Sequence, residues 1–291
     1  MDVHLSPTHI YALNPSLDFE TARQQAIDKR LGIVAGGLGA LLSRPKPEEV
    51  ELVYAEIRFE PLWHVVCATR FAYERNREFS VPVGGAEVRK VTLLGQAFEV
   101  GGTAQAPQPG LLQQLGIGAG GAARAFSVPG VEHCLEESRQ ERFFDAVTGQ
   151  PAPLGGEFAQ KDKTELSDAS ALALEEALVV PPQTSAVKIV KSLLATMIKP
   201  IQADKILEEA VRIETLDLYF RPLYGFEFAW KPKNKTGVAE FDAVTGAMAG
   251  GKVLHTRSDR SITREGLFDI SADTVVSLLP SASSHVNLIV E

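Results

Sequence analysis

The chain has 291 residues, of which 45% are hydrophobic and 23% are charged, and its formal net charge is −8. This composition is typical of a globular protein with a sizeable core. The acidic balance, together with the lack of any run of more than two Lys or Arg residues, argues against nucleic acid and against an anionic membrane surface as partners.

The cysteine content and the apolar segments indicate a compartment. Cys67 and Cys134 are the only two cysteines, which is too few for a disulfide scaffold and fits a reducing environment. The first residues lack the basic and apolar regions of a secretory signal, and the longest apolar run, residues 31–42, is too short to cross a membrane. We therefore expect a cytoplasmic protein with no membrane partner and no cofactor.

The first predicted elements are a helix and a long strand. Asp18 is placed as the N-cap of a helix that continues through Leu42, and the prolines at residues 45 and 47 end it. A strand with alternating apolar residues then leads from Glu48 to the segment Pro61-Leu62-Trp63.

The same order returns later in the chain. Apolar residues between Val187 and Met197 recur at helical spacing, Pro200 breaks the helix, and a long strand leads from Glu208 to Pro222-Leu223-Tyr224. The stretch from Lys231 to Lys235 is expected to be a turn. This recurrence indicates an internal duplication, which fixes the architecture.

A hexapeptide, Phe-Asp-Ala-Val-Thr-Gly, ends both copies, at residues 144–149 and 241–246. The two Pro-Leu-aromatic segments are 161 residues apart and the hexapeptides 97 apart, so the first copy holds about 64 additional residues between these landmarks. We interpret the hexapeptide as a structural turn. Its Asp can accept a hydrogen bond from an N–H two residues further on, and its Gly can adopt a positive φ.

These patterns predict an α+β fold made of two related units, residues 1–165 and 166–291, each with a helix packed on an antiparallel sheet. The first unit carries a long loop insertion near residues 75–138, which includes the Gly-rich tract 101–130. The alternative is that the long strands of both units join one continuous sheet. A free edge of such a sheet would be expected to pair with another chain.

The strand ends at residues 144–150 and 241–247 resemble the terminal strand of PepSY-type small α+β domains, which typically ends in Val-Asp-x-x-Thr-Gly-Glu-Val. The chain is similar to a tandem of PepSY-like units in these strand ends only, and the resemblance implies a helix-plus-sheet topology. PepSY domains are associated with binding or restraining peptidases. Because this chain has a long insertion and lacks the Glu-Val after the glycine, we do not extend peptidase inhibition to it.

Aromatic side chains supply the candidate binding residues. Tyr224, Phe226, Phe228 and Trp230 alternate along one strand and share one face, and Trp63 takes the place of Tyr224 in the first copy, with His64 on the opposite face. Trp63, His64, Tyr224 and Trp230 are therefore the residues expected to contact a ligand or partner, although aromatic residues in such positions are ordinary core residues as well.

Four residues have the chemistry of a zinc site: His64, Cys67, His133 and Cys134. His64 and Cys67 are three apart on a predicted strand and face opposite sides, so we assign no metal site. The mixed-charge stretch from Glu132 to Arg142 is expected to be a solvated face, with strand and helix both open for its first half.

No constellation of catalytic residues recurs in the two copies, so no catalytic residue is assigned. The sequence predicts a non-enzymatic protein- or peptide-binding or regulatory module, with a homodimer through a sheet edge as a further possibility. One alternative is a hydrolase that pairs Cys134 or Cys67 with His64. The other is a small-molecule carrier with a pocket between the units.

Overall fold

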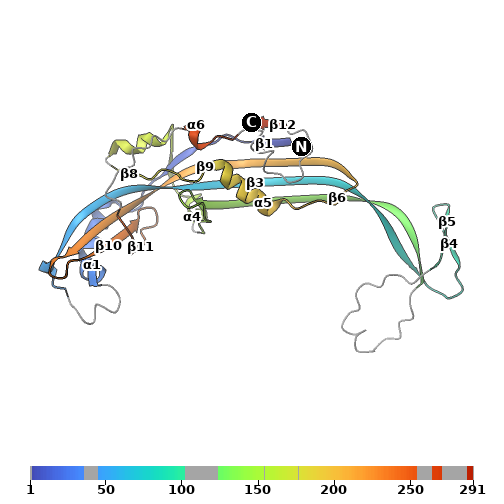
Figure 1. The fold of residues 1–291 in the computed structure, drawn as a ribbon, viewed down its shortest axis with the longest axis horizontal. Coiled ribbons are helices and arrows are strands. Elements are labelled where there is room, and N and C mark those ends of the chain that lie inside the picture. The colour runs from blue at the N-terminus through green and yellow to red at the C-terminus, as the bar shows by residue number, and fades with distance from the viewer. Residues whose placement is uncertain are drawn as a thin grey trace, which may run out of the picture. The chain divides into compact units, whose positions relative to one another are not determined.

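The computed structural model describes residues 2–35, 45–101, 124–153, 155–175, 177–253, 264–270 and 287–290 (Figure 1). Within these ranges, ten strands join in one mixed sheet, and two more form a separate hairpin. The predicted α+β fold with two separate helix-plus-sheet units is therefore wrong. Strands from both copies belong to one sheet, because the long strand of each copy pairs the backbone N–H and C=O groups of one edge with the long strand of the other copy.

Two long strands form the centre of this sheet, β3 (Val50–Val83) and β9 (Lys205–Trp230). They run antiparallel in unit 1, because Glu51 pairs with Lys231 at 2.6 Å while Glu60 pairs with Arg221 at 3.2 Å. On the outer side of β3 lies β6 (Arg124–Asp145), and β10 (Lys235–Asp242) lies antiparallel to β9. Each long strand therefore pairs with the strand that ends in the hexapeptide of its own copy.

Shorter elements complete the fold. The remaining strands of the large sheet are β1 (Asp2–Leu5), β2 (Ile10–Leu13), β7 (Lys163–Leu166), β8 (Leu178–Val179), β11 (Met248–Gly250) and β12 (Asn287–Val290). The separate hairpin is made of β4 (Lys90–Leu93) and β5 (Gln96–Glu99). The α-helices of the described residues are α1 (Phe19–Ala35), α4 (Gly155–Phe158), α5 (Ala186–Met197) and α6 (Arg264–Leu267), and 3-10 turns cover Pro47–Glu49, Ala169–Glu175 and Lys231–Lys233.

The two hexapeptides form nearly identical turns, which confirms the structural interpretation. Asp145 Oδ1 accepts hydrogen bonds from the N–H groups of the second and third residues that follow it, both at 2.8 Å, and Asp242 Oδ1 does the same at 2.8 and 3.0 Å. The closing residues, Gly149 and Gly246, have φ values of +73° and +74°. Such a conformation is open to glycine without steric cost.

The backbone just before the helix of each copy is hydrogen-bonded to the hexapeptide turn of the other copy. The N–H groups of Ser16 and Leu17, just before α1, donate to the carbonyl of Ala243, and those of Gln183 and Thr184, just before α5, donate to the carbonyl of Ala146. The chain therefore exchanges its two helices between the copies. This exchange ties residues far apart in sequence together and explains why the copies do not fold as consecutive units.

The first of these helices begins as predicted from the sequence, and a side chain caps the start of each. Asp18 Oδ1 accepts the N–H of Thr21 at 2.8 Å at the start of α1, and Ser185 Oγ accepts the N–H of Lys188 at the start of α5. The expected continuation of the first helix to Leu42 lies outside the described residues.

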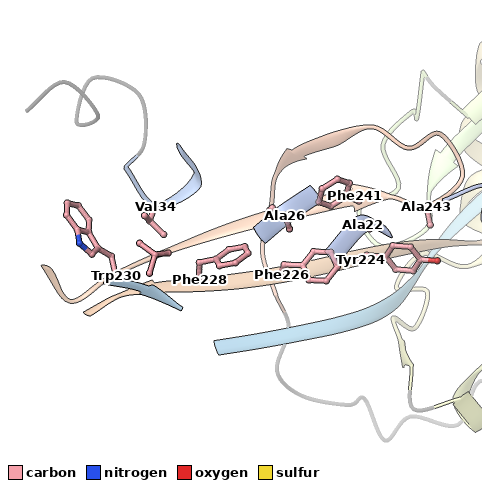
Figure 2. Close-up of a cluster of buried hydrophobic side chains, with 11 residues drawn as sticks. Ala22, Ala26, Val34, Tyr224, Phe226, Phe228, Trp230, Phe241 and Ala243 are labelled. Carbon is pink, nitrogen blue, oxygen red and sulfur yellow. The ribbon is translucent and has the colours of Figure 1, made fainter. Parts of the chain in front are cut away.

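The largest described core cluster lies where α1 packs against β9 and β10. Figure 2 shows the row Tyr224, Phe226, Phe228 and Trp230 along one side of β9, with the small side chains of α1 next to it. Gly237 of β10 makes this approach possible, because a Cβ there would lie 2.7 Å from the carbonyl oxygen of Ile33. The predicted buried face of this strand is thereby confirmed.

Contacts divide the chain into two compact units. Unit 1 comprises residues 1–69, 137–200 and 210–291 and holds both hexapeptide turns and both exchanged helices; unit 2 comprises residues 70–136 and 201–209. The boundary at residue 165 was placed between the two sequence copies, and it stays a prediction.

Unit 2 contains most of the predicted insertion. Residues 124–130 of the Gly-rich tract belong to β6, and residues 102–123 lie outside the described ranges. In the part of the chain that is described, no helix is long and apolar enough to cross a membrane.

Candidate interaction surface

Three of the four predicted binding residues lie in the interior of unit 1. Trp63 is fully buried, and its indole N–H donates to the carbonyl of Thr184 at 2.8 Å. Tyr224 and Trp230 belong to the cluster in Figure 2, and the indole N–H of Trp230 donates to Glu49 at 3.1 Å. The three side chains fill the core, and both indole N–H groups are satisfied there, so these residues offer no surface to a ligand.

His64, the fourth candidate, takes part in a chain of directed hydrogen bonds. The Lys163 ammonium donates to the Tyr219 hydroxyl at 3.0 Å, and this hydroxyl lies 3.4 Å from Nδ1 of His64. Nε2 of His64 lies 2.8 Å from a carboxylate oxygen of Glu141. Each ring nitrogen of His64 therefore faces a polar group, the Tyr219 hydroxyl at Nδ1 and the Glu141 carboxylate at Nε2.

Burial favours the protonated form of the phenol in this chain of groups. The pKa of the Tyr219 hydroxyl is raised well above its usual range, first by burial and then by the negative charges of Asp217 and Glu141. The His64 ring is itself stacked on Phe143, with ring centroids 4.2 Å apart and planes 5° apart. The protonated Tyr219 phenol and the stacked His64 ring join strands β3, β6, β7 and β9, so this network holds these strands together.

A pocket of about 480 Å³ adjoins the His64 network in unit 1. Glu141 and Phe143, which contact His64, line it together with residues of the segment 151–160. The His64 ring and the Tyr219 hydroxyl themselves are buried behind this lining and do not form part of it. The lining therefore combines the charged Glu141 and Arg142 and the amide of Gln160 with apolar side chains, and no Ser, Thr or Cys is among the described residues that line it.

The two cysteines have different surroundings. Cys67 is fully buried, and its pKa is raised to about 12, first by burial and then by the negative charge of Glu214. Its thiol is therefore protonated at neutral pH and unsuited to nucleophilic attack. Cys134 lies half-buried on β6 in unit 2, next to His133, whose Nδ1 lies 3.3 Å from Glu74. Among the described residues, no group of three or more His, Cys, Asp or Glu side chains is arranged to hold a metal ion.

A second buried polar cluster surrounds Arg58 on β3. Its guanidinium, which is almost completely buried, contacts Glu56 at 2.6 Å, Glu60 at 3.1 Å and Glu240. It also donates to the carbonyl of Lys252 at 2.9 Å. A planar guanidinium with several donors suits such a site, where three carboxylates converge on one cation.

Two exposed apolar side chains of a regular strand lie on β6, within unit 2. Val131 and Leu135 are 47% and 53% exposed and flank His133 on one side of the strand. The opposite side holds Glu132 and Glu136, whose carboxylates reach Arg75 at 3.1 Å and the Tyr73 hydroxyl at 2.6 Å. This strand therefore turns its apolar side outward and its acidic side toward partners within the unit, which reverses the usual pattern.

One edge of β6 has no partner strand in the described part of the chain. Among the described residues, β3 is the one strand that pairs with β6. Backbone contacts to the rest of the chain on the other edge occur near its two ends, from Gly101 to Ala125 and from Ala152 to Phe143. We call the stretch 127–137, with its outward apolar side and open edge, the β6 surface.

The charge of the β6 surface is acidic. Between Arg124 and Ser138 the sequence contains Glu132, Glu136 and Glu137 and no Lys or Arg. The exposed Phe79 ring of unit 2 lies next to Gly130 of this surface. Exposed apolar groups of this kind mark protein-interaction sites when they occur together.

Comparison with known proteins gives no relative of this chain. No protein-family model matches the sequence, and no curated protein and no solved structure matches it. The similarity to PepSY-type strand ends stays a prediction, and the function has to be argued from the geometry of the chain.

Sequence reasoning missed the residues around His64 and Arg58. Tyr219, Lys163 and Glu141 are distant from His64 in the sequence, so no local pattern joins them. Glu56, Arg58 and Glu60 do alternate along a predicted strand, and this spacing places them on one face. That signal was available, whereas the approach of Glu240 depends on the pairing of strands from both copies.

Proposed function

We propose that this chain is a non-enzymatic protein-binding module that receives an extended segment of a partner protein along the β6 surface. The observation that carries the proposal is the outward position of Val131 and Leu135 on a strand whose neighbouring edge is open. In strand addition, the main chain of the partner pairs with a free edge, and alternate side chains of the partner contact the apolar groups beside it.

The charge of the β6 surface selects the chemistry of the partner. Residues 125–137 contain three glutamates and no Lys or Arg. Glu132 already contacts Arg75 and Glu136 the Tyr73 hydroxyl, and the remaining excess of negative charge favours a segment in which Lys or Arg alternates with apolar residues. A second copy of β6 would bring acidic side chains opposite one another, which is unfavourable across paired strands. A partner segment of basic and apolar character is therefore favoured over a homodimer.

The two alternatives from the sequence have less support. A nucleophilic pair that uses Cys67 conflicts with the raised pKa of its buried thiol. A carrier with Trp63, Tyr224 and Trp230 around a ligand would require these side chains to border a cavity, and they are packed in the interior instead. A cytoplasmic location stays a prediction.

Selection from a displayed library of short random peptides on the purified full chain tests the proposal. We expect enriched peptides that alternate apolar residues with Lys or Arg. Their affinity, measured by fluorescence anisotropy, should fall on the order of tenfold or more in the Val131→Asp/Leu135→Asp double variant, because two apolar contacts are replaced by charge.

A matched control is available in Val53→Asp, since Val53 is also an exposed strand valine but lies in unit 1. This variant should bind the selected peptides as the wild type does. Peptides that bind all three proteins equally, or a selection without any shared pattern, would contradict the proposal. Self-association that is lost in the double variant would assign the surface to a second copy instead.

A further inference from the structure

The β4–β5 hairpin of unit 2 has an unusual residue at its tip. Leu93 and Gln96 are paired, so the turn consists of Leu94 and Gly95 alone. Their φ values are +51° and +80°, which is the pattern of a type I′ turn. The first central position of this turn normally holds Asn, Asp or Gly, since a leucine with positive φ crowds its own backbone.

The leucine at this position is almost fully exposed. Leu94 has 98% of its surface accessible, and Leu93 beside it is 43% exposed. Neither the backbone strain nor the exposed apolar side chain contributes to the stability of the hairpin. Residues that combine strain with no structural role are concentrated at functional positions.

Contacts within unit 2 hold the hairpin at its base. The Arg124 guanidinium donates to the carbonyl of Ala86 at 2.8 Å and to that of Val100 at 3.2 Å. The Phe98 ring packs against Phe126, with centroids 5.5 Å apart. A rigid base means that little conformational entropy is lost when the tip is bound, which is the condition for an effective anchor.

We propose that Leu94, with Leu93 beside it, is an anchor that inserts into an apolar pocket of a protein partner. This contact is separate from the β6 surface and does not depend on it. Apolar anchors that fill a pocket and are surrounded by water-excluding contacts dominate the energy of many protein interfaces.

The charges of the hairpin favour a protein over a membrane. Its charged residues, Glu87, Arg89, Lys90 and Glu99, sum to zero, and the whole chain has a net charge of −8. Membrane-surface binding by so few apolar residues requires cationic side chains to support it. The hairpin therefore lacks the charge that would hold it at an anionic bilayer.

The pockets described for this chain favour a different protein over a second copy. One, of about 480 Å³, includes Glu141 and Arg142 in its lining, and another, of about 450 Å³, includes Arg77 and Glu78. Insertion of leucine next to these groups would remove them from water without a new hydrogen bond. A partner with a purely apolar pocket suits the anchor better.

Site-specific photo-crosslinking tests the proposal. A benzophenone amino acid is placed at Leu94, and at the exposed Thr92 as a control, in the full chain expressed in the cells that make it. We expect one protein to crosslink at position 94 through residues that line an apolar pocket. That protein, once purified, should bind the wild type and Leu94→Met alike and bind Leu94→Asn on the order of tenfold more weakly or worse.

Leu94→Asn separates loss of binding from loss of folding, because asparagine is favoured in this turn and should not lower the melting temperature. Peptides selected on the β6 surface should keep their affinity for this variant, so failure of one proposal is distinguishable from failure of the other. Unchanged binding of the partner to Leu94→Asn would overturn the anchor. Crosslinks to a second copy or to no protein, or wild-type binding to vesicles with phosphatidylserine, would overturn it as well.

Discussion

The two hexapeptide turns allow a matched pair of substitutions, Gly149→Ala and Gly246→Ala. Both glycines have φ near +74°, and an alanine in this conformation costs about 1–2 kcal/mol at either site. The surroundings differ. A Cβ at Gly149 would lie 3.1 Å from Oγ1 and 3.4 Å from Cγ2 of Thr184, whereas a Cβ at Gly246 would meet no atom within 4 Å.

Thr184 cannot move away without loss. Its N–H donates to the carbonyl of Ala146 at 2.9 Å, and its own carbonyl accepts the indole N–H of Trp63 at 2.8 Å. Crowding against a fixed neighbour adds roughly 1 kcal/mol or more. We therefore expect a loss of unfolding free energy of about 1–2 kcal/mol for Gly246→Ala and about 2–3 kcal/mol for Gly149→Ala.

Equilibrium urea unfolding, followed by tryptophan fluorescence, measures both losses, since Trp63 and Trp230 both lie in unit 1. Asp145→Ala and Asp242→Ala test the turn hydrogen bonds themselves, which are almost the same, and Asp242→Ala should cost more because Asp242 also lies 3.6 Å from the Arg221 guanidinium. Equal losses for the two glycine variants would refute the argument from Thr184, and no loss in either would refute the positive-φ turns.

Three further predictions concern buried ionisable groups. Arg58→Met should lower the unfolding free energy by about 3–5 kcal/mol in urea titration, because it removes the cation from a cluster of carboxylates; a loss below about 1 kcal/mol would contradict the buried cluster. Native thiol titration at pH 8 should modify Cys134 and leave Cys67 unmodified, and rapid labelling of both would show that Cys67 is accessible. The contribution of the Cys67 thiol to stability should be lost only as the pH rises from about 9 toward 12. Burial raises the pKa of Asp217, so the wild type should lose stability relative to Asp217→Asn as the pH rises above about 4, and a gain of stability relative to this variant over the same change would contradict the assignment.

Local features of this fold could be read from the sequence. Asp and Gly in the hexapeptide, the Asp18 cap and the alternation of Tyr224 to Trp230 each depend on residues close together in the chain, and each is confirmed. The turn after Trp230 is confirmed too, with Asn234 in the left-handed region at φ 47°.

Long-range pairing could not be read in the same way. The duplication suggested two separate units, but β3 and β9 pair with each other and the helices α1 and α5 are exchanged between copies. Alternation shows which residues share a face of a strand and not whether that face is covered. For this reason Trp63, on the face expected to be buried, was a candidate ligand contact and lies in the core, whereas Val131 and Leu135 were not singled out and lie outward.

The central claim is that a partner strand adds to the open edge of β6, and amide hydrogen exchange with and without a selected peptide tests it most directly. Strand addition predicts slower exchange of backbone N–H groups in residues 127–137, with exchange in the β4–β5 hairpin unchanged. Slower exchange at other strands only, or no change in β6 at saturating peptide, would contradict the claim.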